Sequence, residues 1–191
     1  MQKRLYRIGS VLFFVFWLIV LGFSYWYFLV KPKQWFDPEM VQPPLLSEPQ
    51  NQASLRAILQ TGFPKLRNDS QWFIRFLQPD CGCERFVELY HQSFSNRAPQ
   101  DMQVATVDFS STIFTDAQLK QISAWVPATP AVVVFDLDGS IRYLGPYHQE
   151  GICSAENSYL EPVLESMVKG KPLSVLNTLV FGCFCSTGES L

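Results

Sequence analysis

The sequence has no acidic residue before Asp37, no second long apolar run and little charge overall, 17% of its 191 residues. The lack of further long apolar runs excludes a polytopic membrane protein. An apolar content of 48% excludes low-complexity disorder, because disordered segments bury too little apolar surface to fold. The length suits one compact domain with an appendage.

An excess of positive charge is also missing from the larger part of the chain. Beyond residue 33, ten basic residues stand against 17 acidic ones, a net charge of −7. Domains that bind nucleic acid normally carry a positive patch that meets the phosphates. The charge balance therefore argues against nucleic acid as a partner.

The one long apolar run, residues 8–30, holds 23 residues without a charge. At ~1.5 Å per residue, a helix of this length crosses a hydrocarbon core of ~30 Å with some tilt. Trp26 and Tyr27 near its end suit a membrane interface. The alternative is a cleaved signal peptide, which has a shorter apolar core and a small-residue cleavage site. Since the run continues into Lys31 without such a site, we predict one uncleaved N-terminal transmembrane helix.

The distribution of charge and cysteine predicts the compartment. Three basic residues precede the apolar run and two follow it, a slight bias toward an N terminus inside the cell. Five cysteines, four of them in two Cys-x-Cys pairs, are typical of an oxidising compartment. The expected location is the inner (cytoplasmic) membrane, single-pass, with a periplasmic C-terminal domain.

Three parts follow from the distribution of prolines and apolar residues. Residues 1–30 form the predicted N-terminal transmembrane anchor. Residues 31–52 contain five prolines among polar residues and predict a semi-extended tether. Residues 53–191 carry the patterns of a folded domain, which ends in a tail with the second Cys-x-Cys pair.

The domain shows alternating strand and helix patterns. Apolar residues spaced three or four apart predict helices at residues 53–60, 83–94, 115–125 and 157–168. Short apolar runs predict strands at residues 72–77, 104–109, 131–135 and 140–144, the last two joined by a short turn. The order β–α–β–α–β–β–α predicts an α/β fold whose mixed central sheet has a parallel portion and an antiparallel edge.

This order is that of the thioredoxin core, and three segments make the resemblance specific. WFIRFLQPDCGCERF is a strand ending in a cysteine pair that opens a helix. Ala128-Thr129-Pro130 precedes the third strand, and VVVFDLDGSIRYLGPY forms a hairpin. Over residues 70–170, the chain resembles a membrane-anchored thioredoxin-like protein of a poorly characterised bacterial group, similar in layout to periplasmic TlpA-type thiol–disulfide proteins. The resemblance implies a three-layer thioredoxin-like fold, a cis bond before Pro130 and a substrate-peptide contact at Thr129.

The resemblance further implies that Cys81 and Cys83 are catalytic, Cys81 attacking as a thiolate and Cys83 resolving the mixed disulfide. In this sequence Cys81-Gly82-Cys83 replaces the usual Cys-x-x-Cys. The start of a helix lowers the pKa of a thiol, whereas the neighbouring carboxylates of Asp80 and Glu84 raise it. A disulfide between Cys81 and Cys83 would close a small, strained and easily reduced ring, which Gly82 best permits.

Three further cysteines are candidate secondary redox residues: Cys153, Cys183 and Cys185. Cys153 is expected in a loop, with His148, at the redox end of the domain. Cys183 and Cys185 lie in the tail, whose apolar run 175–184 predicts an added strand or a packed segment. A redox relay would require the tail to fold back until one of them reaches Cys81 or Cys83. They could equally complete a four-thiolate site for zinc, copper(I) or an iron–sulfur cluster, or form a structural disulfide.

The leading functional hypothesis is a membrane-tethered thiol–disulfide oxidoreductase that acts on thiols or disulfides of exported proteins. It needs no cofactor and no metal. The first alternative is a metal-handling, copper-binding protein similar in layout to Sco-type chaperones, for which His148 would be the histidine ligand. The second is a non-catalytic binding module of the same fold. The substrate protein, the electron donor and the redox direction are not encoded in any recognisable motif.

Overall fold

The computed structural model describes residues 2–27, 33–37, 48–65, 69–99, 101–149, 152–171 and 173–188, in two units. The first unit, Met1–Lys33, contains the helix α1 (Gln2–Tyr25), whose apolar side chains from Val11 to Leu21 are all exposed. Within the described ranges, no helix combines the length and the apolar character that crossing a membrane requires. Residues 28–30 of the predicted span lie outside these ranges.

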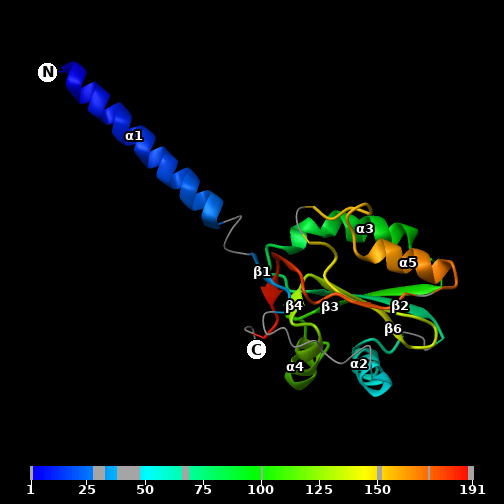
Figure 1. Ribbon diagram of the computed structural model, residues 1–191. Coiled ribbons are helices and arrows are strands. Elements are labelled where there is room, and N and C mark those ends of the chain that lie inside the picture. Colours follow the sequence, from blue (N-terminus) through cyan, green and yellow to red (C-terminus); the bar gives the residue numbers. More distant parts are fainter. Residues whose placement is uncertain are drawn as a thin grey trace. The chain divides into compact units, whose positions relative to one another are not determined.

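The second unit, Gln34–Leu191, is built on a five-stranded mixed sheet (Figure 1). The strand order is β3 (Met102–Asp108), β2 (Gln71–Leu77), β5 (Ala131–Phe135), β6 (Ile141–Gly145) and β7 (Val175–Leu176). Strand β2 runs parallel to β3 and antiparallel to β5; β5 and β6 form an antiparallel hairpin, and β7 is parallel to β6. The predicted α/β fold with a mixed central sheet is confirmed, and the arrangement fits a thioredoxin-like fold.

Helices cover both faces of the sheet (Figure 1). Helices α2 (Pro49–Gly62) and α4 (Asp116–Trp125) pack on one face, and α3 (Glu88–Arg97) and α5 (Leu160–Val168) on the other. Side chains alternate along a strand. Trp72, Ile74 and Phe76 of β2 therefore lie in the core under α2 and α4, and Phe73 lies in the core under α3 and α5. Strand β5 is buried along its whole length, since it lies in the middle of the sheet with helices on both sides.

The segment after the first cysteine pair departs from the single helix predicted for residues 83–94. It forms a 3₁₀ turn, η2 (Glu84–Phe86), before α3 begins at Glu88. Two long-range contacts shape this turn. The Phe86 carbonyl accepts a hydrogen bond from the Cys153 backbone N–H at 2.8 Å, and the Glu84 carboxylate is held by Arg75 of β2 at 3.1 Å.

The tail folds back over the domain and contributes three short strands. After β7, the Asn177 N–H donates to the Leu144 carbonyl at 2.9 Å. This close approach requires the glycine at 145, where φ is +152° and an added Cβ would lie 2.5 Å from the Asn177 carbonyl oxygen. Strand β8 (Phe181–Cys183) then pairs with β1 (Lys33–Trp35), and β9 (Cys185–Ser186) pairs with β4 (Ala128–Thr129). The apolar run 175–184 is therefore both an added strand and a packed segment.

Core packing holds this tail in place. Val180 and Phe184 are buried in the same core as Trp72. The Phe184 ring meets Phe36 edge-on, with the ring centroids 5.4 Å apart. Phe36 belongs to the region 31–52 predicted as a tether, of which residues 31–32 and 38–47 lie outside the described residues.

Candidate functional site: two Cys-x-Cys segments joined by disulfides

The first Cys-x-Cys segment lies in the turn that follows β2. The Cys81 N–H donates to the Gln78 carbonyl at 2.9 Å, and Cys83 directly precedes the 3₁₀ turn. Both side chains are buried, with 4% of Cys81 and 1% of Cys83 exposed. The two cysteines therefore differ little in exposure.

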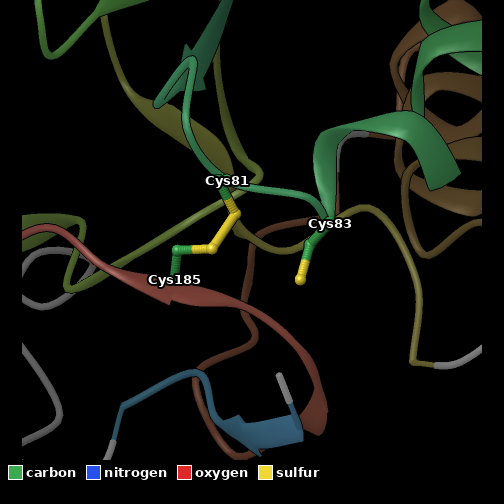
Figure 2. A group of neighbouring side chains, drawn as sticks. All are labelled: Cys81, Cys83 and Cys185. Carbon is green, nitrogen blue, oxygen red and sulfur yellow. A yellow bond between two sulfur atoms is a disulfide. The ribbon is translucent and has the colours of Figure 1, made fainter. Parts of the chain in front are cut away.

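The second Cys-x-Cys segment lies directly against the first. Cys81 is bonded to Cys185 and Cys83 to Cys183, with Cα–Cα distances of 5.8 Å and 5.4 Å. Figure 2 shows the first of these bonds, with Cys83 pointing into the same space beside it. The return of the tail to Cys81 and Cys83, which the relay hypothesis requires, is confirmed. The expected disulfide between Cys81 and Cys83 is wrong, because each is bonded to a tail cysteine.

Thr129 and Pro130 lie beside the Cys81–Cys185 bond. The Thr129–Pro130 peptide bond is cis, as the resemblance implies. The Thr129 carbonyl oxygen lies 3.8 Å from the Cys81 sulfur, and Thr129 pairs with Cys185 in the short ladder between β4 and β9. The tail thus occupies the edge of β4 at the position that the resemblance assigns to a bound substrate peptide.

Several contacts other than the disulfides hold the second segment. The Thr187 N–H donates to the Pro127 carbonyl at 3.0 Å, and its hydroxyl donates to the Val126 carbonyl at 2.8 Å. A Cβ added at Gly182 would overlap the backbone carbonyl oxygen of Gln149. Together with buried Phe184 between the two cysteines, these contacts fix the backbone on both sides of the sulfur atoms.

Cys153 is the free cysteine among the described residues, and it lies in a different core. It is buried with Tyr90, Tyr147 and Leu160 in the cluster under α3 and α5. Burial raises the pKa of its thiol to about 12, so at neutral pH it is not a thiolate. The structure does not place Cys153 in the sulfur cluster formed by the other described cysteines.

An ion-pair network next to Cys83 was not predicted from the sequence. Arg75 of β2, only 5% exposed, donates to the Glu84 carboxylate at 3.1 Å and to the Glu88 carboxylate at 2.9 Å. Burial raises the pKa of Glu84 to about 7, against the opposing effect of Arg75. A sequence signal exists, since Arg75 is the only charged residue in the apolar run WFIRFL. A buried arginine in a strand requires nearby carboxylates.

Comparison with known families decides the family of the chain. Residues 50–187 match the model described as Domain of unknown function (DUF6436). The chain belongs to this family. The match spans the whole sheet and all five cysteines, so the two disulfides lie within the DUF6436 domain. A search of curated proteins finds no match to the sequence.

Proposed function

We propose that this DUF6436 protein is a membrane-tethered, thioredoxin-like thiol–disulfide oxidoreductase that acts on exported proteins, similar in layout to TlpA-type proteins. The observation that carries the proposal is the pairing of two Cys-x-Cys segments beside Thr129. The disulfide-bonded sulfurs lie just beyond the end of β2. Backbone hydrogen bonds and core packing hold the segments that carry them. The redox unit of the proposal is the four-cysteine centre, with Cys81 and Cys83 joined to Cys183 and Cys185.

The exchange starts at the tail cysteines. Cys183 and Cys185 are partly exposed, whereas Cys81 and Cys83 are buried. A thiolate of a dithiol substrate attacks the Cys185 sulfur, the Cys81–Cys185 bond breaks, and Cys81 leaves as a thiolate that takes up a proton. The second substrate thiolate then attacks the mixed disulfide and releases Cys185. The substrate loses two electrons and two protons, and the protein disulfide gains them.

A dithiol assay tests this proposal. The full-length oxidised protein is mixed with a reduced peptide that carries two cysteines, and the peptide disulfide is followed by mass spectrometry. We expect stoichiometric oxidation of the peptide, and a lower yield in the double variant Cys81→Ala/Cys185→Ala, which keeps only the Cys83–Cys183 disulfide. The Cys153→Ala variant is the matched control and should react like the parent. A natively folded parent whose disulfides do not exchange with the peptide would contradict the proposal.

The membrane tether is the second part of the proposal, and its support comes from the sequence. Residues 8–30 carry no charge, and the apolar side chains of α1 from Val11 to Leu21 are exposed. We expect the expressed protein to stay in the membrane fraction after alkaline carbonate washing and to leave it only with detergent. Deletion of residues 1–30 should release the domain into the soluble fraction. Release of the full chain by carbonate alone would refute anchoring.

A further inference from the structure

The four bonded cysteines form one compact cluster of sulfur atoms. The sulfurs of Cys81, Cys83 and Cys185 all lie within 4.8 Å of one another. The fourth sulfur, that of Cys183, is bonded to Cys83. Two segments about 100 residues apart in the sequence therefore bring four soft donor atoms to one place.

This cluster does not depend on the disulfides alone. Phe184, which lies between the tail cysteines, is 4% exposed and packs in the same core as Trp72. Strand β9 pairs with β4. Thr187, which follows β9, donates two hydrogen bonds to the backbone carbonyls of Val126 and Pro127, which directly precede β4. These contacts involve no sulfur atom, so reduction of both disulfides does not remove them.

We propose that the reduced protein binds one zinc ion through the thiolates of Cys81, Cys83, Cys183 and Cys185. Tetrahedral zinc with Zn–S bonds of ~2.3 Å separates its sulfur ligands by about 3.8 Å. Three of the sulfurs lie within 4.8 Å of one another, about 1 Å beyond this separation, and the fourth is bonded to Cys83. Four thiolates are a recognised structural zinc set, and the buried position of Cys81 and Cys83 excludes water from two of the ligands.

Formation of the site couples the metal to the redox state of the protein. A dithiol or phosphine reductant supplies two electrons to each disulfide and is itself oxidised, and each disulfide takes up two protons to give two thiols. Zinc then displaces the four thiol protons as it binds. The oxidised protein has no thiolate in the cluster, so zinc binding and the two disulfides exclude each other. The inference rests on the proposed function in one respect: disulfide exchange with a substrate is the reaction that would generate the reduced cluster.

A zinc titration tests the inference on the full-length protein in detergent. The protein is reduced with a phosphine under anaerobic conditions, freed of reductant, and titrated with zinc against a colorimetric chelator. We expect one tightly bound zinc ion per reduced chain and none per oxidised chain. Stoichiometric binding should be lost in the Cys183→Ser and Cys185→Ser variants and kept in Cys153→Ser, which removes a cysteine outside the cluster.

A second measurement covers the case in which a serine variant does not fold. Zinc should protect four thiols of the reduced parent from alkylation, counted by mass spectrometry, and leave Cys153 as reactive as it is without metal. Reduced parent protein that binds no zinc, or that binds it equally after loss of Cys183 and Cys185 or after oxidation, would overturn the inference. The dithiol assay contains no metal, so a protein can pass one test and fail the other.

Discussion

Removal of both disulfides should cost much more free energy of unfolding than the sum of the two single removals. In the chain-entropy model, the Cys81–Cys185 bond alone closes a loop of 104 residues and stabilises by about 5 kcal/mol. With that bond present, Cys83–Cys183 closes a ring of only about six residues, which stabilises by about 2 kcal/mol. Either disulfide can be lost while the other still closes the long loop.

The expected losses are therefore about 2 kcal/mol for Cys81→Ala/Cys185→Ala, about 2 kcal/mol for Cys83→Ala/Cys183→Ala, and about 7 kcal/mol for the quadruple variant. Urea unfolding of the four proteins measures the cycle. Cys153→Ala gives the cost of removing a buried sulfur without a disulfide and is subtracted. The parent under strong reductant, without metal, should match the quadruple variant. Simple additivity would show that the two bonds do not share one loop.

At a pH well above the Glu84 pKa of about 7, replacement of Arg75 by methionine should destabilise the domain by about 3 to 5 kcal/mol, because it leaves a buried carboxylate without its counter-charge. The Glu84 side chain is 15% exposed and Arg75 is its ion-pair partner at 3.1 Å. Replacing the carboxylate as well removes the uncompensated charge. The double variant Arg75→Met/Glu84→Gln should therefore recover most of the lost stability.

Thermal and urea unfolding at a pH well above 7, where Glu84 is ionised, measure this effect. The matched control is Lys169→Met, which breaks an exposed pair with Glu165 in which both side chains are 65% exposed. Such surface pairs contribute less than about 0.5 kcal/mol. An Arg75→Met variant as stable as the Lys169→Met variant would show that Arg75 does not compensate a buried charge.

The sequence predicted the central strands well, because their signal is local. The runs at residues 72–77 and 131–135 correspond closely to β2 (Gln71–Leu77) and β5 (Ala131–Phe135). Both are short apolar runs rich in aromatic or β-branched residues, buried on both faces. The helix predicted for residues 83–94 was interrupted by contacts from distant segments. Arg75 and the Cys153 backbone hold the first turn, and periodicity within the helix carries no information about either.

The candidate site was predicted in its residues but not in its connectivity. Cys-x-Cys spacing identifies cysteines as partners by proximity in the sequence, and for Cys81 and Cys83 that inference was wrong. The actual pairing depends on the path of the tail. This path is fixed by Phe184 and Thr187, whose side chains are buried in the domain. The two disulfides span about 100 residues, and their partners cannot be read from either segment alone.

The nested disulfides also set an order of events during synthesis of the chain. Cys185 follows Cys81 by 104 residues, which takes roughly 5 to 20 seconds at ribosomal rates of ~5–20 residues per second. Throughout that interval, Cys81 and Cys83 are present without their native partners, and Cys153 is made before either partner arrives. The first bonds open to the nascent chain are therefore non-native. The native pairing can form only late, once the tail has been made.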